Sequence, residues 1–121
     1  MKVAVISANF SGFDKPFDWV SQGVDIFSIT ERQMPVRNNA MTPRLQSKLV
    51  KEFGWQLYPD YDVYIWVDAS FKLLAGAVDW LLSYLKDADM VFFKHPWNKT
   101  IKSEYQFIKN NFHKKYLVSR Y

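Results

Sequence analysis

Residues 63–68, Val-Tyr-Ile-Trp-Val-Asp, decide the fold class of this chain, because β-branched and aromatic side chains of this kind favour strands. Three similar runs are found at 3–8 (VAVISA), 24–29 (VDIFSI) and 90–94 (MVFFK). None of them alternates cleanly between apolar and polar residues, which is the pattern expected when both faces of a sheet are covered. The sequence therefore predicts four strands in one mainly parallel sheet.

Three helical patterns separate or follow these runs. Thr42 and Pro43 provide an N-cap and a first-turn proline, and an amphipathic helix then carries apolar residues at four-residue spacing: Leu45, Leu49, Phe53 and Leu57. The second pattern comprises Val78, Leu81, Leu82 and Leu85, and the third Ile101, Tyr105, Ile108 and Phe112. Strands that alternate with helices predict an α/β fold, with a small, mostly parallel sheet flanked by helices.

The composition indicates one domain, residues 1–121. The apolar share of 49% is enough for one core, and the net charge of +4 suits either an anionic partner or plain solubility.

The chain has no cysteine, so a disulfide framework, a thiolate zinc site and a cysteine nucleophile are excluded. The first apolar run is too short for a signal peptide or a membrane span. A cytoplasmic location is expected.

Candidate site residues lie where the predicted strands end, because ligands of open α/β sheets bind at the carboxyl ends of the strands. Asp68 follows an apolar strand, so we expect it to contact a cation, a metal or several N–H donors; the alternative is a cap on the following turn. His95 follows the fourth run and suits a divalent metal or a phosphate, or only a structural hydrogen bond. If their strands are neighbours, Asp68 and His95 could share one ion.

The helix after Thr42 carries a basic stripe of Arg44, Lys48 and Lys51. Such a stripe suits a diphosphate, and Arg44 can give two parallel hydrogen bonds to one phosphate group, although a solvated helix face is the plain alternative. The sequence has no phosphate-binding P-loop, no Gly-x-Gly-x-x-Gly after the first strand, no His-Glu-x-x-His and no Gly-x-Ser-x-Gly. P-loop enzymes, Rossmann dehydrogenases, zinc proteases and α/β-hydrolases are therefore not indicated.

The order of these segments resembles the glycosyltransferase-like domains of the GT-A type. The resemblance covers nearly the whole chain and is closest to a plant and bacterial family with an Arg-x-x-x-Lys helix, a Trp-Ile/Val-Asp strand and a His-Pro strand end. Here these motifs are Arg44 to Lys48, Trp66 to Asp68, and His95-Pro96.

The resemblance implies a nucleotide-sugar donor, most simply a UDP-sugar, and transfer of its sugar to an unknown acceptor. Carried onto this chain, Asn9 and Phe10 would lie beside the base or ribose, and Arg44 and Lys48 beside the diphosphate. Asp68 would take the first position of the Asp-x-Asp metal motif. His95 and Glu104 would stand near the sugar as candidates for proton transfer.

Ser70 occupies the position of the second acid of that motif. A divalent ion, Mn²⁺ or Mg²⁺, would then be held by one carboxylate fewer, and Arg44 and Lys48 could instead neutralise the leaving diphosphate. Enzymes of this type usually continue into an acceptor-binding region. The chain could therefore be a short form completed by a second subunit, as in a homo-oligomer, a donor-binding remnant, or a fragment.

Two other function classes remain open. A non-catalytic nucleotide- or nucleic-acid-binding module would use the positive charge and exposed aromatic rings, and a basic cluster supports it: Lys109, Lys114, Lys115 and Arg120. A structural domain retained for protein contacts would tolerate the loss of Asp68 and show no nucleotide affinity. Glycosyl transfer from a nucleotide-sugar is the leading hypothesis.

Overall fold

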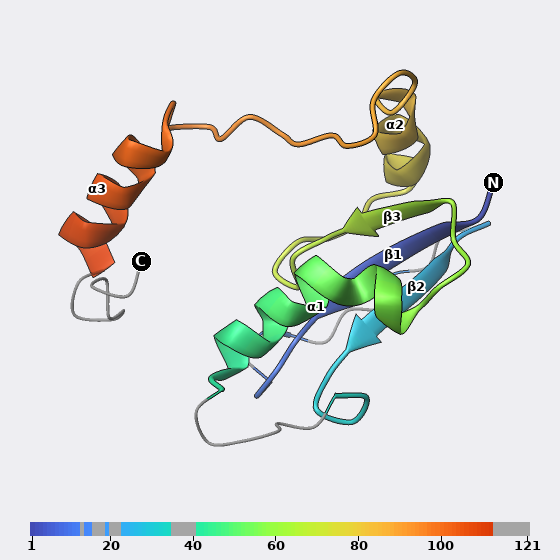
Figure 1. Ribbon diagram of the computed structural model, residues 1–121, viewed down its shortest axis with the longest axis horizontal. Coiled ribbons are helices and arrows are strands. Elements are labelled where there is room, and N and C mark those ends of the chain that lie inside the picture. Colours follow the sequence, from blue (N-terminus) through green and yellow to red (C-terminus); the bar gives the residue numbers. More distant parts are fainter. Residues whose placement is uncertain (13, 16–18, 20–22, 35–40, 113–121) are drawn as a thin grey trace. The chain divides into compact units, whose positions relative to one another are not determined.

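A computed structural model shows a small α/β fold with three strands and three helices (Figure 1). It describes residues 1–12, 14–15, 19, 23–34 and 41–112. In chain order the elements are β1 (Val3–Ala8), β2 (Asp25–Ile29), α1 (Pro43–Leu57), β3 (Val63–Trp66), α2 (Ala77–Ser83) and α3 (Ile101–Phe112). The chain divides into two compact units, Met1–Ser83 and Tyr84–Tyr121, and the whole sheet belongs to the first.

The sheet is parallel and has the strand order β2-β1-β3, which confirms the predicted α/β class. β1 is the central strand, and its Ile6 is paired with Phe27 of β2 and with Trp66 of β3. The crossover from β2 to β3 contains α1, as parallel strands require a long connection. β1 is buried along its whole length because it has a strand on each side and a helix packed on each face.

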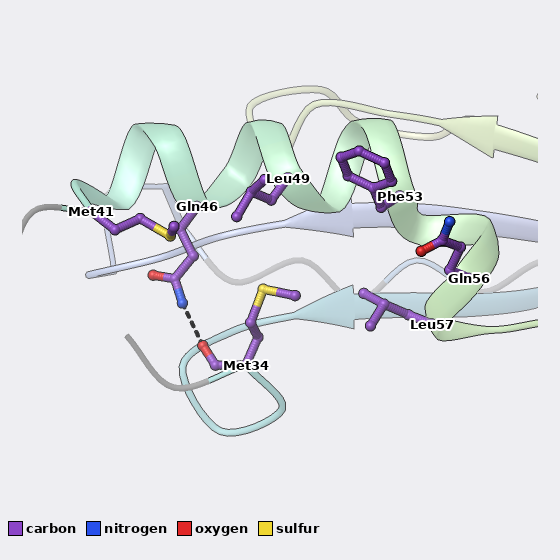
Figure 2. A pocket seen from close by; sticks show the side chains of 7 residues that line it. All are labelled: Met34, Met41, Gln46, Leu49, Phe53, Gln56 and Leu57. Carbon is purple, nitrogen blue, oxygen red and sulfur yellow. Dashed lines mark hydrogen bonds between the residues drawn. The ribbon is translucent and has the colours of Figure 1, made fainter. Parts of the chain in front are cut away.

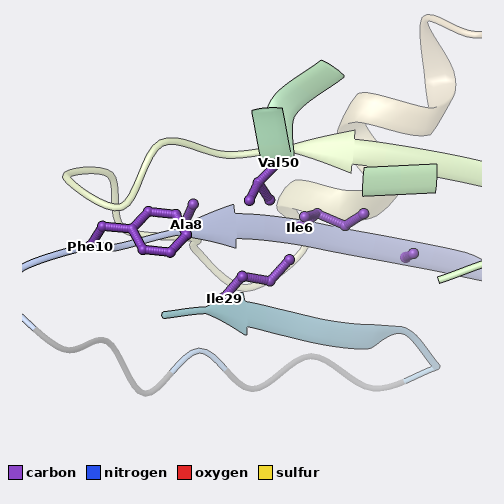
Figure 3. Close-up of a cluster of buried hydrophobic side chains, with 6 residues drawn as sticks. Ile6, Ala8, Phe10, Ile29 and Val50 are labelled. Atoms are coloured by element: carbon purple, nitrogen blue, oxygen red, sulfur yellow. The ribbon is translucent and has the colours of Figure 1, made fainter. Parts of the chain in front are cut away.

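Both faces of β1 are covered, which explains its lack of polar alternation. Even-numbered residues of β1 belong to a core cluster that also contains Val50 of α1: Ala4, Ile6, Ala8, Phe10, Ile29 and Val50 (Figure 3). On the opposite face, Val3 and Val5 form a second cluster with Val78 of α2. The sheet is thus the middle layer of the first unit, with α1 and α2 packed on opposite faces.

α1 begins and ends where the sequence predicts. The Thr42 hydroxyl accepts a hydrogen bond from the Leu45 N–H (3.3 Å), and the Tyr58 N–H donates to the Gly54 carbonyl (3.1 Å) at the other end. The face that packs on the sheet differs from the expected apolar row. Within α1 the buried residues are Gln46, Val50 and Gly54, whereas the apolar row is 36–48% exposed: Leu45, Leu49, Phe53 and Leu57.

Close approach of α1 to β1 explains this choice of face. A Cβ atom placed on Gly54 would lie 2.9 Å from Cδ1 of Ile6, closer than carbon atoms tolerate. The row that contains Gly54 therefore lets the helix backbone lie directly over β1, and the bulkier leucine row is displaced to the flank. Residue size at the contact, and not the apolar periodicity alone, sets the rotation of α1.

The fourth predicted strand, residues 90–94, is absent, and this part of the prediction is wrong. The segment has no strand assignment, and Phe92 and Phe93 are 79% and 63% exposed. A strand is stabilised by its ladder partners, and the described residues of its unit, 84–112, contain no strand with which it could pair. High strand propensity alone therefore does not make this run a strand when no described strand of its unit can pair with it.

The two later helices agree with the sequence in position. α2 ends at Ser83, before Leu85, and is shorter than predicted. α3 begins after Thr100, whose hydroxyl accepts from the Ser103 N–H (3.1 Å), while the Ser103 hydroxyl accepts from the Thr100 N–H (3.2 Å), as in a capping box. None of the described helices has the length and apolar character needed to cross a membrane.

Candidate functional site

The predicted donor site lies at the carboxyl edge of the sheet, where several segments of the first unit meet. All three strands are parallel, so they end at the same edge. α1 starts at that edge because it connects the end of β2 to the beginning of β3 (Figure 1). β1 lies between β2 and β3, so the connection from β1 to β2 and the connection from β2 to β3 run in opposite directions across the sheet. Ligands of open α/β sheets bind beside such a reversal.

Asp68 is at the surface just beyond β3. Its Oδ1 accepts a hydrogen bond from Nε1 of Trp66 at 2.7 Å, and its backbone carbonyl accepts from the Phe71 N–H at 2.9 Å. The side chain is exposed, so the desolvation expected from the sequence does not arise. The indole N–H fixes one carboxylate oxygen in place. Trp66 is therefore a positioning residue for Asp68, although the sequence indicates it only as part of a strand.

Trp66 also lies beside the basic face of α1. Nζ of Lys51 is 5.9 Å from the centroid of the Trp66 ring, a cation–π distance. Arg44 and Lys48 lie on the exposed face nearer the start of α1, and the first turn has no acidic residue. The positive end of the helix dipole and these two cations have the same sign. The start of α1 thus has the electrostatic character that an anionic group requires.

Asn9 and Phe10 serve the structure of the loop after β1. The Asn9 side chain makes two hydrogen bonds to the backbone of Asp14. Its Nδ2 donates to the Asp14 carbonyl (2.9 Å), and its Oδ1 accepts from the Asp14 N–H (3.2 Å). Phe10 is 2% exposed and packs in the core cluster around Ile6. A stacking contact between Phe10 and a base would require its ring to leave the core. The backbone of this loop is the part that reaches the surface.

Glu31 joins the loops after β1 and β2. Its carboxylate accepts a hydrogen bond from the Ser11 N–H, and this bond holds the pKa of Glu31 below its usual range. Ser11 and the next residue, Gly12, both have positive φ angles, of 59° and 58°. In the sequence Glu31 stands only at a strand end, and no local signal there indicates its contact with Ser11, twenty positions away.

No protein-family model, curated protein or solved structure matches this chain. The glycosyltransferase-like resemblance thus rests on the short motifs at Arg44 to Lys48, Trp66 to Asp68 and His95-Pro96.

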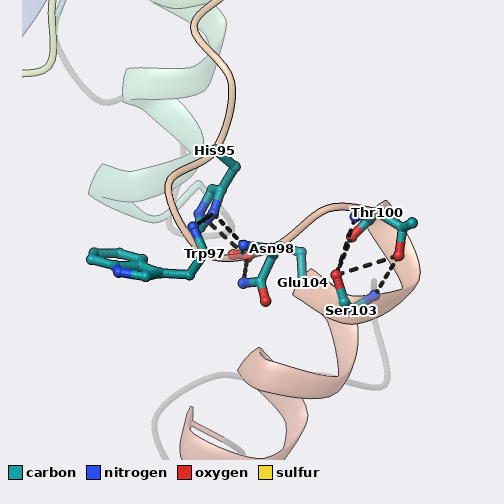
Figure 4. A network of polar contacts seen from close by, with 6 residues as sticks. All are labelled: His95, Trp97, Asn98, Thr100, Ser103 and Glu104. Carbon is teal, nitrogen blue, oxygen red and sulfur yellow. Dashed lines mark hydrogen bonds and ion pairs between the residues drawn. The ribbon is translucent and has the colours of Figure 1, made fainter.

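His95 and Glu104 form a polar network in the second unit (Figure 4). Nε2 of His95 lies 3.4 Å from Oε2 of Glu104, and the two side chains are 42% and 38% exposed. Nδ1 of His95 accepts from the N–H groups of Trp97 (3.3 Å) and Asn98 (3.0 Å), and the Asn98 amide donates to Glu104. With Nδ1 as an acceptor, the proton of a neutral imidazole is on Nε2 and faces the carboxylate.

The structure therefore brings together two of the three predicted catalytic residues, His95 and Glu104. Asp68 belongs to the other unit. Ser70, the position of the absent second acid, is exposed in the turn after β3. Among residues 1–12, 14–15, 19, 23–34 and 41–112, no three His, Asp or Glu side chains are grouped as metal ligands would be. Of the C-terminal basic cluster only Lys109 is described, since Lys114, Lys115 and Arg120 lie outside the described residues.

Proposed function

We propose that this chain binds a nucleotide-sugar at the carboxyl edge of its sheet and takes part in transfer of the sugar to an acceptor. The observation that carries the proposal is the joint position of Asp68 beyond β3 and of the cationic start of α1 at the same edge. An anionic diphosphate complements the two cations of α1. Asp68, oriented by Trp66, offers its second carboxylate oxygen to a donor hydroxyl or to a divalent ion.

Charge neutralisation is the chemical contribution we assign to α1. Breaking the bond between sugar and diphosphate develops negative charge on the leaving group, and fixed cations stabilise that charge. Arg44 and Lys48 are one helical turn apart, so they can contact neighbouring phosphate groups. Ser70 leaves Asp68 as the single acid of the motif. More of the negative charge on the leaving diphosphate would therefore be neutralised by Arg44 and Lys48. Mn²⁺ or Mg²⁺ would supplement them.

His95 and Glu104 are proposed to move a proton during transfer. Glu104 is the group suited to accept a proton from an acceptor hydroxyl, because its carboxylate is partly exposed and hydrogen-bonded. His95 holds that carboxylate in place through Nε2, while the two backbone N–H groups fix the ring through Nδ1.

A thermal-shift series with UDP, GDP, CDP and their sugar conjugates, each with and without Mn²⁺, tests the binding step. A ligand that binds only the folded state stabilises it by about 2.7 kcal/mol at a roughly hundredfold excess over Kd. We expect one base to be preferred, and we expect Arg44→Ala and Asp68→Ala to lose most of the shift. Lys2→Ala and Asp62→Asn are matched controls, because both residues are exposed and lie directly before β1 and β3, at the opposite, amino edge of the same sheet.

Retention of the full shift in both Arg44→Ala and Asp68→Ala would contradict this assignment of the site. The absence of a shift with every nucleotide at millimolar concentration would contradict the proposed function itself. Release of free UDP from a UDP-sugar, followed with and without added acceptor sugars, then separates transfer from binding. Loss of release in Glu104→Gln with unchanged nucleotide binding is the result expected for a proton-transfer residue.

Binding of single-stranded nucleic acid is the second candidate, and one surface favours it. Residues 92–102 expose aromatic rings between lysines, with Trp97 80% exposed. Stacking on such rings together with phosphate contacts is how single strands are held. Fluorescence anisotropy with labelled dT and U oligonucleotides at about 50 and 200 mM salt tests it. Binding that falls steeply with salt and is lost in Trp97→Ala would support it over nucleotide-sugar binding.

A further inference from the structure

The turn that follows β3 carries an exposed aromatic ring close to Asp68. Phe71 is 63% exposed, and its backbone N–H donates to the Asp68 carbonyl at 2.9 Å, which closes a turn from Asp68 to Phe71. The Cα atoms at the two ends of such a turn lie within about 7 Å of each other. The ring of Phe71 is therefore carried within one turn of the carboxylate that we assign to the nucleotide-sugar.

The fold holds this turn in place on both sides of Phe71. Ala69 is 9% exposed, and Leu73 packs against the core cluster on the α2 face of the sheet. The Asp68 carboxylate is itself fixed by Nε1 of Trp66 at 2.7 Å. Glycine is favoured at the fourth position of the commonest turns of this kind, so neither turn formation nor the core explains a phenylalanine there. An exposed apolar side chain on a fixed turn is typical of a contact with a ligand.

We infer that Phe71 binds the acceptor of the proposed transfer, and that this acceptor is a pyranose sugar with one C–H face on the phenylalanine ring. The inference rests on the proposed function, because that function places the donor at Asp68. An acceptor hydroxyl has to reach the donor's sugar, so the acceptor must lie beside Asp68, as Phe71 does.

The residue types on this turn define the ligand class. The face of an aromatic ring is electron-rich, and it attracts the weakly positive C–H groups that cover one face of a pyranose. Sugar hydroxyl groups at the rim of that contact would meet the exposed Ser70 hydroxyl and the second carboxylate oxygen of Asp68. The donor's base is also flat, but the diphosphate separates it from the donor's sugar. A ring within one turn of Asp68 therefore suits the acceptor better than the base.

The transfer step then has a defined balance of bonds. The acceptor oxygen forms a bond to the anomeric carbon of the donor's sugar, and the bond between that carbon and the diphosphate oxygen breaks with its electron pair. The hydroxyl proton of the acceptor goes to a general base, the role proposed for Glu104. Phe71 takes no part in these bond changes and is a positioning residue for the acceptor.

Two probes that share their hydroxyl chemistry but differ in the ring test the inference: methyl β-D-glucopyranoside and the open-chain glucitol. Saturation-transfer NMR with irradiation of aromatic protons shows which sugar protons lie against a protein ring, and the ¹⁵N–¹H shifts of Ser70 and Phe71 give the Kd. We expect saturation on the C–H protons of one pyranoside face. Glucitol should bind about tenfold more weakly, because an open chain must lose more conformational freedom.

The substitution Phe71→Leu removes the aromatic ring and keeps an apolar side chain. It should weaken pyranoside binding about three- to tenfold and abolish the saturation transfer, whereas Phe71→Tyr should retain both. Phe53→Leu is the matched control. Phe53 is 48% exposed and, with Gln46, lines a pocket on the flank of α1 (Figure 2). Its replacement should leave pyranoside binding unchanged.

The outcomes separate this inference from the proposed function. Equal pyranoside affinity in the natural protein and in Phe71→Leu, or no pyranoside binding at the highest soluble concentration, would overturn the inference even where UDP binds. Loss of the UDP thermal shift in Phe71→Leu would assign the ring to the donor's base, which overturns the inference and supports nucleotide binding. Pyranoside binding at Phe71 without any nucleotide shift would support a sugar site and contradict the proposed function.

Discussion

The contact between α1 and β1 gives the sharpest prediction of stability, because two known effects oppose each other at Gly54. Replacing glycine by alanine inside a helix stabilises it by about 1 kcal/mol. The new Cβ, however, would lie 2.9 Å from Cδ1 and 3.4 Å from Cγ2 of Ile6, which is itself only 4% exposed. Overpacking a core contact costs about 1–3 kcal/mol. We therefore expect Gly54→Ala to lower the free energy of unfolding by about 1 kcal/mol.

Ile6→Val removes Cδ1, the atom closest to the added methyl group. Alone, this change should cost about 1 kcal/mol, as is usual for an isoleucine-to-valine change in a core. In the Ile6→Val background the clash is relieved, so Gly54→Ala should raise the free energy of unfolding by up to about 1 kcal/mol. The two substitutions should therefore be coupled by about 2 kcal/mol.

Urea denaturation of the natural protein, the two single variants and the double variant measures this coupling, with tryptophan fluorescence and circular dichroism as independent probes. Val5→Ala is the control, because Val5 lies on the opposite face of β1 and should be additive with Gly54→Ala. Equal effects of Gly54→Ala in the natural protein and in the Ile6→Val background would refute the close approach of helix and sheet.

Two further predictions concern single hydrogen bonds. Thr42→Ala removes the acceptor for the Leu45 N–H and should lower the free energy of unfolding by about 1 kcal/mol, whereas Thr42→Ser should retain most of it in the same urea assay. The Tyr61 hydroxyl donates to Oδ2 of Asp25 at 2.7 Å, and this bond raises the pKa of Tyr61 from 10.0 to about 12. Its contribution to stability is complete below pH 10 and is lost as the pH rises through about 12. Tyr61→Phe should therefore be less stable than the natural protein at about pH 8. The urea midpoints of the two proteins should converge as the pH rises above 10. A difference between the midpoints that stays constant with pH would contradict the hydrogen bond.

Local signals in the sequence were reliable wherever the decisive interaction is itself local. The cap at Thr42 and the proline after it located the start of α1, and the apolar spacing located α3. The first three apolar runs are strands because each has a neighbour in the sheet. The fourth run has the same propensity, but no strand lies beside it among the described residues of its unit. Propensity indicates which segments can pair, and the presence of a partner decides which ones do.

The candidate site also combines features that the sequence indicates with features that only the structure shows. The sequence indicated Asp68 as a strand-end carboxylate, but only the structure shows that it is exposed and held by Trp66. The resemblance implies that Phe10 lies beside a base, but its ring is in the core, since it continues the alternation of β1 two residues beyond Ala8 and packs in the cluster that contains Val50. His95 and Glu104 are nine positions apart in the sequence, and the turn that precedes α3 brings them into contact.

The sequence by itself determined the α/β class, the segments that are able to form strands, and the approximate positions of all three helices, because these depend on residue types within one segment. Tertiary structure decided which face of α1 packs on the sheet and which of its side chains are buried there. The apolar row of α1 is the more hydrophobic face, but the row with Gly54 allows the closer approach to Ile6. That rotation buries Gln46 and opens the pocket beside it, which no periodicity in the sequence could indicate.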